Sequence, residues 1–189
     1  MTARAAKASV RHALRASTVR AHAQVDAFFP EGLSSRRDYR IYLRGMHALL
    51  SALQEALAGC AAAELWNQSA RLAHLRQDLA ALDAKPLTPA GAMRIAGAPG
   101  AAGALYVVEG SALGARLLLA DTASLGYTEK GANFLRGHAA DAQRWRRFVA
   151  WLEAQNFDSQ AERAMFESAA ATFACAKQEF RRAALMEQV

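Results

Sequence analysis

Two glycines inside an apolar stretch constrain this chain more than any other feature of its sequence. Residues 105–119 read LYVVEGSALGARLLL, which is typical of a long helix, yet Gly110 and Gly114 lie in its interior. Each interior glycine costs a helix about 1 kcal/mol relative to alanine, and the chain uses alanine freely elsewhere. A spacing of four places both glycines on one helix face. Two explanations stay open: a second helix packs closely there, or a bulky ligand or a bend requires the bare backbone.

The composition predicts an all-α fold. The 189 residues are rich in Ala, Leu, Arg, Gln and Glu, and include only four prolines, a pattern that favours helices. The length fits one domain, so we predict a single-domain helical bundle over residues 1–189. Periodicity and turn residues predict helices at about 8–29, from Ser34 or Ser35 to Gly59, 62–82 with Leu65 facing inward, 101–120, around 145–152 and 159–186. Residues 83–100 and 126–137 are expected to be loops.

Charge and cysteine content exclude several classes of protein. Cys60 and Cys175 lie far apart and outside any CxxC pair, so neither a disulfide framework nor a cysteine metal site is expected. The longest apolar stretch contains Glu109 and Arg116, which argues against a membrane span. No secretory signal is recognised, so a cytoplasmic protein is expected. The net charge of +6 suits an anionic ligand or an acidic partner, and no nucleic-acid-binding motif accompanies it.

His22 is the most informative of the five histidines. None of them forms an HxxxH or HExxH pattern, so local spacing predicts no multi-histidine metal site. His22 lies on or beside the apolar stripe of the first helix, where it is either a partly buried residue with a satisfied hydrogen bond or the axial ligand of a metal that a macrocycle already holds.

Basic residues accompany this histidine. Arg15 lies two turns earlier on the same face, and Lys177 and Arg181 lie four apart on the final helix. Each of these cations taken alone fits a solvated face. Together with His22 and the glycines, they indicate a flat, apolar ligand with two acid groups.

Two segments resemble haem oxygenases. Residues 14–26, LRASTVRAHAQVD, resemble the proximal helix of that family, and residues 103–114, GALYVVEGSALG, resemble the distal helix of its bacterial branch. That branch includes the enzymes that supply biliverdin to bacterial phytochromes. DYRIYL at 38–43 and WRRF at 145–148 resemble its second helix and a later tryptophan-containing helix. The resemblance therefore extends, in order, over most of the chain.

The resemblance implies a fold, a reaction and roles for individual residues. It implies a helical protein that holds haem between the first and the glycine-bearing helix and opens it to biliverdin, with release of iron and carbon monoxide. Haem is then both substrate and cofactor, molecular oxygen is the co-substrate, and a ferredoxin, flavodoxin or reductase supplies electrons. The implied roles are iron ligand for His22, distal catalytic positions for Gly110, Ser111 and Gly114, and haem-binding contacts for Arg15, Tyr106, Lys177 and Arg181.

The chain also departs from the family pattern. Ser111 stands where many haem oxygenases have aspartate, which puts the route of proton delivery in question. His138 is expected to be a surface residue at a helix start, with contact to the ligand pocket as the alternative. Two alternatives remain: a non-catalytic haem carrier or sensor, and a basic all-α interaction domain. A monomer that binds neither nucleic acid nor membrane is expected.

Overall fold

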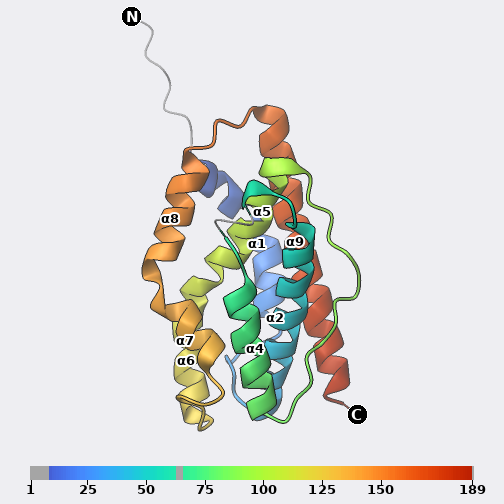
Figure 1. Cartoon of the computed structure of the whole chain (residues 1–189), viewed down its shortest axis with the longest axis vertical. Coiled ribbons are helices and arrows are strands. Elements are labelled where there is room, and N and C mark those ends of the chain that lie inside the picture. The colour runs from blue at the N-terminus through green and yellow to red at the C-terminus, as the bar shows by residue number, and fades with distance from the viewer. Residues whose placement is uncertain (1–8, 63–65, 189) are drawn as a thin grey trace, which may run out of the picture.

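The computed structural model describes residues 9–62 and 66–188, and helices dominate it (Figure 1). The only other regular feature among these residues is an isolated bridge between Pro30 and Gly32. The helices are α1 (Val10–Asp26), α2 (Arg36–Ala56), α4 (Ser69–Ala81), α5 (Gly97–Gly110), α6 (Ala112–Ser124), α7 (Asn133–Ala140), α8 (Ala142–Glu153) and α9 (Ser159–Met186). The all-α prediction is confirmed. Leu65 falls outside the described residues.

The long helix α9 holds the bundle together, because it packs against α1, α2 and α5. Two glycines let neighbouring helices approach it closely. A Cβ atom on Gly103 of α5 would collide with the carbonyl oxygen of Met165, and one on Gly45 of α2 would collide with the ring of Phe180. The close helix crossings of this fold therefore lie at Gly45 and Gly103, and not at the glycine pair that the sequence pattern emphasised.

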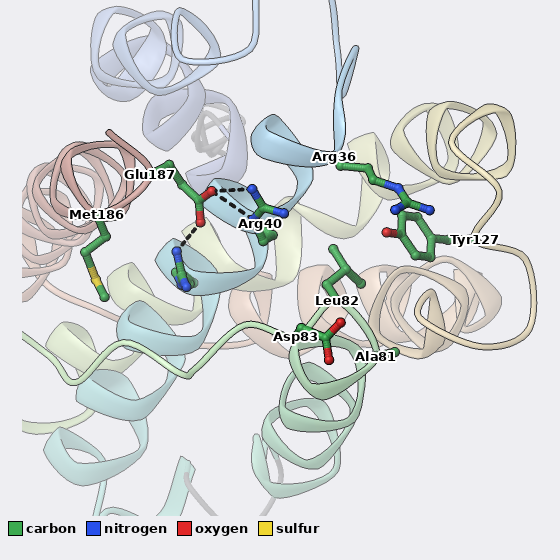
Figure 2. Close-up of a pocket in the computed structure, with 9 residues that line it drawn as sticks. Arg36, Arg40, Ala81, Leu82, Asp83, Tyr127, Met186 and Glu187 are labelled. Carbon is green, nitrogen blue, oxygen red and sulfur yellow. Dashed lines mark hydrogen bonds and ion pairs between the residues drawn. The ribbon is translucent and has the colours of Figure 1, made fainter. Parts of the chain in front are cut away.

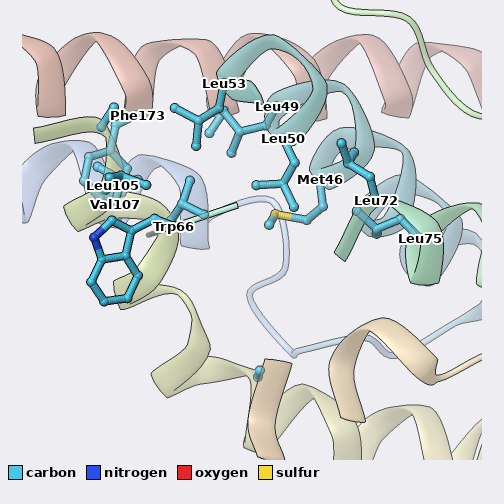
Figure 3. Packing of buried hydrophobic residues seen from close by; sticks show 14 of the residues in the cluster. Met46, Leu49, Leu50, Leu53, Trp66, Leu72, Leu75, Leu105, Val107 and Phe173 are labelled. Carbon is cyan, nitrogen blue, oxygen red and sulfur yellow. The ribbon is translucent and has the colours of Figure 1, made fainter. Parts of the chain in front are cut away.

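The apolar core lies between α2, α4, α5 and α9 (Figure 3). Helix α2 is strongly amphipathic, with apolar residues recurring every three or four positions. Fully buried side chains of this core include Leu43, Leu50, Leu53, Leu75, Leu79, Leu105 and Phe148. Burying each such side chain contributes about 1.5–3 kcal/mol, so the core fixes how the helices that carry polar residues are placed.

Polar side chains begin several helices. Ser35 caps α2, since its Oγ accepts a hydrogen bond from the backbone N–H of Asp38 at 3.1 Å. Asp141 caps α8 and Asp158 caps α9 in the same way. The predicted starts of the second and the last helix are confirmed, and the last helix has the predicted bounds.

The glycine-bearing segment differs from its predicted form. It is broken at Ser111 into α5 and α6, and it starts earlier than expected, at Gly97, whose φ of +60° suits glycine. The prediction of one continuous helix over 101–120 was wrong, and so was the loop assigned up to residue 100. The bend proposed as one reason for the glycines is therefore present.

Helix α7 was missed by the sequence pattern. It occupies residues that were expected to be a connection. The pattern missed it because the carboxylate that caps it comes from a distant part of the chain. The buried carboxylate of Asp78 on α4 accepts the backbone N–H of Asn133 at 2.9 Å and that of Phe134 at 2.7 Å. A cap supplied from 55 residues away leaves no local pattern to recognise.

Candidate functional site

His22 lies on an exposed face of α1 together with Arg15, Val19 and Asp26. Its side chain is 61% exposed, and Nδ1 lies 2.7 Å from Oδ2 of Asp26, one turn later. The edge of Phe173 on α9 packs against the ring, with centroids 5.6 Å apart. Among the described residues nothing bonds Nε2. The imidazole is therefore oriented by a carboxylate at one nitrogen while the other faces outward, so His22 is not a buried core histidine.

Tyr106 of α5 lies near α1, one turn before the predicted ligands. Burial raises the pKa of Tyr106, and its phenol lies close enough to Thr18 and to the charge of Arg15 for both to offset part of that rise. In Figure 1, α1 and α5 both run away from the end where α8 and α9 are joined. His22 and Gly110 therefore each lie one turn beyond the contact between Tyr106 and Thr18.

The predicted glycine face is open. An added Cβ on Gly110 would meet only the ring of Trp145, at an ordinary 3.6 Å, and one on Gly114 would meet nothing within 4 Å. On the same helix as Gly114, Leu113 is 62% exposed and Leu117 is 75% exposed. Neither glycine serves a close helix crossing, so that explanation is wrong for this pair. Helix α6 instead presents bare backbone flanked by exposed apolar side chains.

A buried ion network lies directly before Gly110. The carboxylate of Glu109 is fully buried and accepts two hydrogen bonds from Arg71 on α4, both 2.9 Å, and two from Arg144 on α8, at 2.7 and 3.0 Å. Burial alone would raise the pKa of Glu109, but the two guanidinium groups outweigh it and hold the pKa below its ordinary value. The network ties the end of α5 to α4 and α8.

Sequence reasoning did not identify this network, although one signal was available. Glu109 is a lone carboxylate in a strongly apolar segment, and a carboxylate in such a place is buried only when cations pair with it. Its partners lie 38 and 35 residues away, so the sequence does not indicate which arginines they are.

Ser111 makes two hydrogen bonds at the break between α5 and α6. Its Oγ donates to the carbonyl oxygen of Val108 at 2.8 Å and lies 2.9 Å from Nε2 of His138 on α7. His138 is only 3% exposed and its ring stacks on Phe134. The expectation of a surface histidine was therefore wrong. Burial and the charges of Arg71 and Arg144 hold the pKa of His138 well below its ordinary value.

Lys177 and Arg181 lie apart from Arg15 and Tyr106. They line a cavity of about 320 Å³ between α1 and α9, with Ala21 and Gln24 on its α1 side. Nζ of Lys177 is 2.9 Å from Oε1 of Gln24. At about 100° per residue, Gln24 lies half a turn around α1 from Arg15. The charge of Arg15 acts on Tyr106, whereas the cationic pair of α9 lies on another side of α1.

Comparison with known proteins identifies the family. The heme oxygenase family model matches residues 8–182. The chain belongs to the haem oxygenase family. The structure is similar to that of the heme oxygenase from Neisseria meningitidis solved with NO and CO bound, with a TM-score of 0.72 and 27% sequence identity over 94% of this chain and 92% of that one. No curated protein sequence matches the chain. As a haem oxygenase, the protein degrades haem, which is both substrate and prosthetic group, with oxygen as co-substrate.

The described residues of this haem oxygenase include no multi-ligand metal cluster. Among the described residues, no group of three or more His, Cys, Asp or Glu side chains lies close enough to hold a metal ion. The exposed imidazole of His22 suits an iron whose other ligands come from a porphyrin.

A second cavity of this haem oxygenase lies away from the predicted site residues (Figure 2). It measures about 440 Å³ and is lined chiefly by the α2 residues Arg36, Arg40 and Arg44, with Tyr127 and Glu187. Glu187 pairs with both Arg40 and Arg44, while Arg36 lies over the ring of Tyr127. None of the predicted site residues lines this cavity.

The apolar segment Gly97–Ser124 is long and hydrophobic enough to cross a membrane by composition alone. In this haem oxygenase it forms α5 and α6, and 44% of its most apolar window is buried inside the protein. A buried core helix meets the same compositional criteria as a membrane span. The paired carboxylate of Glu109 in its middle fits a core helix.

Proposed function

We propose that this enzyme binds haem between the exposed face of α1 and the break between α5 and α6, and opens it there to biliverdin, with release of iron and carbon monoxide. Haem supplies the iron that activates oxygen. The chain's own residues then have three tasks: to hold the iron from one side, to leave space on the other, and to fix the macrocycle by its acid groups.

His22 is the proposed proximal ligand. Support comes from its exposed ring, its unbonded Nε2 among the described residues, and the carboxylate of Asp26 at Nδ1. Asp26 accepts the Nδ1 proton, which leaves the lone pair on Nε2 to bind the iron, and it fixes the plane of the ring. Phe173 limits rotation of the imidazole from the other side.

Gly110 and Gly114 are the proposed distal positions, with Ser111 between them. The absence of side chains at these glycines leaves room for oxygen to lie close to the ring edge. Leu113, Leu117 and Val19 are exposed apolar residues on the facing helices, and covering them with a porphyrin would remove apolar surface from water. The residues present therefore fit a flat, apolar ligand.

Arg15 and Tyr106 are the proposed partners of one haem carboxylate. Arg15 shares the face that carries His22, and its charge offsets part of the rise that burial causes in the pKa of Tyr106. A guanidinium with a phenol is a strong donor pair for a carboxylate. Lys177 and Arg181 remain proposed partners of the second carboxylate. Their position across α1 requires the haem to extend past Phe173, which lines their cavity.

The remaining proposals concern partners and setting. The net charge of +6 suits docking of an acidic ferredoxin, flavodoxin or reductase as electron donor. We also propose a cytoplasmic monomer of the phytochrome-associated bacterial type that binds neither nucleic acid nor membrane. Support for the subtype comes from the segments at residues 14–26 and 103–114.

The oriented, exposed imidazole of His22 is the observation that carries the proposal. Titration of the protein with haemin is expected to give a Soret band that shifts or weakens in His22→Ala. Addition of a reductant such as ascorbate, or of a ferredoxin system, is expected to bleach the band and yield a bile pigment. A band that persists under reduction indicates a carrier, and a chain that gives no band at all contradicts the site.

A further inference from the structure

We propose that His138 is a positioning residue for haem degradation: it locks the hydroxyl of Ser111 as a hydrogen-bond acceptor at the break between α5 and α6. This inference rests on the proposed function, in which Ser111 lies on the distal side of the haem. It goes beyond that function because it assigns a role to a buried histidine on α7 that does not line the haem face.

The direction of the hydrogen bonds follows from counting protons. Ser111 Oγ has one proton, and the carbonyl oxygen of Val108, 2.8 Å away, can only accept it. The contact of 2.9 Å between Oγ and Nε2 of His138 is then a bond that the imidazole donates. His138 is therefore the tautomer with its proton on Nε2, and the serine oxygen keeps one unused lone pair.

The surroundings of His138 hold this tautomer in place. Its ring stacks on Phe134 with centroids 5.2 Å apart. The charged groups that face it are Arg71 and Arg144, both bound to Glu109, and their positive charges together with burial oppose protonation of the ring. A neutral imidazole with a fixed Nε2–H is what remains.

The other ring nitrogen shows that packing alone does not explain this residue. Nδ1 of His138 is buried and has no hydrogen-bond partner among the described residues. A buried acceptor without a partner is unfavourable, and a phenylalanine at this position would avoid that cost. The histidine therefore carries the cost of an unpaired Nδ1 but provides the hydrogen bond from Nε2 to Ser111.

The consequence concerns water on the distal side. A hydroxyl whose proton is committed to Val108 can only accept a hydrogen bond from a water molecule. That water then turns its second hydrogen away from Ser111. The pair of Ser111 and His138 thus orients water at the position where many haem oxygenases carry an aspartate.

The first test uses the haem-free protein. Long-range ¹H–¹⁵N correlation spectra of the histidine side chains, recorded from about pH 5.5 to 8.5, are expected to show His138 as the Nε2–H tautomer without titration. Ser111→Ala is expected to shift the Nε2 resonance. A titrating ring, or a proton on Nδ1, overturns the proposal whether or not the protein binds haem.

The second test compares turnover of variants that retain the haemin Soret band. His138→Gln places an amide N–H near the position of Nε2, whereas His138→Asn places it nearer Nδ1. We expect His138→Asn and Ser111→Ala each to slow bile-pigment formation about tenfold. His138→Gln should retain much of the unmodified rate. The double variant Ser111→Ala/His138→Asn should be no slower than either single variant, because both changes remove the same bond.

Spectra of the haemin-loaded ferric protein distinguish a positioning role of His138 from a role in stability alone. The visible spectrum reports the acid–alkaline transition of the ferric protein. We expect the midpoint pH of this transition to shift by about half a unit or more in Ser111→Ala and His138→Asn, and less in His138→Gln. Additive losses in the double variant, or equal rates in all variants, contradict the proposal. Absence of a Soret band in the unmodified protein contradicts the proposed function and leaves the haem-free test standing.

Discussion

His22 and Asp26 form a pair along one face of α1, with Nδ1 of the imidazole 2.7 Å from Oδ2 of the carboxylate. Both side chains are more than half exposed, and an exposed polar pair of this kind contributes little to stability. The pair therefore matters chiefly for the direction in which Nε2 points.

Asp26→Asn tests whether Asp26 orients the His22 ring without contributing to the stability of the fold. We expect the free energy of unfolding to change by less than about 0.5 kcal/mol, whereas haemin affinity or turnover falls about 10- to 100-fold because the ring loses its orienting partner. Chemical denaturation and haemin titration measure the two effects. Glu55→Gln, which removes an exposed carboxylate from α2, serves as the control and should alter neither. A variant that loses stability but keeps its affinity argues against an orienting role.

Glycine substitutions distinguish open backbone from close packing. Gly114→Ala is expected to stabilise the fold by about 0.5–1 kcal/mol, since its Cβ meets nothing within 4 Å. Gly114→Leu is expected to keep the helical circular dichroism but block haem binding or turnover. Gly103→Ala is the matched contrast, because its Cβ meets the backbone of Met165, and it should lower the melting temperature. Unfolding of Gly114→Leu would indicate that this glycine serves packing instead.

Glu109→Gln is expected to destabilise the protein strongly. The change leaves the buried guanidinium of Arg71 without its carboxylate partner, and breaking a buried ion pair from one side costs about 3–5 kcal/mol. Thermal and urea unfolding at neutral pH measure the loss. Glu55→Gln, a change at an exposed carboxylate of α2, is expected to cost much less.

The same carboxylate predicts an acid-dependent loss of stability. The pKa of Glu109 in the folded protein lies below its ordinary value of 4.5, so its contribution is complete above that value and disappears as the pH falls through the lower, folded pKa. Melting temperatures recorded from pH 7 to pH 3 should therefore fall less steeply in Glu109→Gln than in the unmodified protein. Parallel curves would show that other groups cause the acid transition.

The two cationic clusters can be ranked by haemin affinity. Arg15→Gln and Tyr106→Phe are expected to weaken binding several-fold each, with less than additive effects together because the two side chains lie close to one another. Lys177→Gln and Arg181→Gln report separately on the α9 cavity. If only the α9 variants weaken binding, the carboxylates lie on the Gln24 side of α1 and the haem must be turned accordingly.

The part of the site that lies within one helix was predictable from the sequence. Arg15, His22 and Asp26 share a face of α1 because helix periodicity places them there, and no tertiary information is needed. The same holds for Gly114 on α6. Helix content followed from the apolar periodicity for a similar reason, and the bounds of α9 were correct because Asp158 provides a local cap.

The part that joins distant segments was not predictable in this way. The bond from His138 to Ser111 spans 27 residues, and the cap of α7 by Asp78 spans 55. Both depend on how the helices pack. Helix periodicity also gave no sign that Lys177 faces Gln24, since the register between α1 and α9 is set by tertiary packing.

The position of α9 has a consequence for how the enzyme matures in the cell. Phe173, which packs on His22, belongs to α9, and that helix also completes the core with α2 and α5. Protein synthesis proceeds from the N-terminus, so α1 is made long before α9. The imidazole of His22 therefore gains its aromatic neighbour only after α9 has been synthesised.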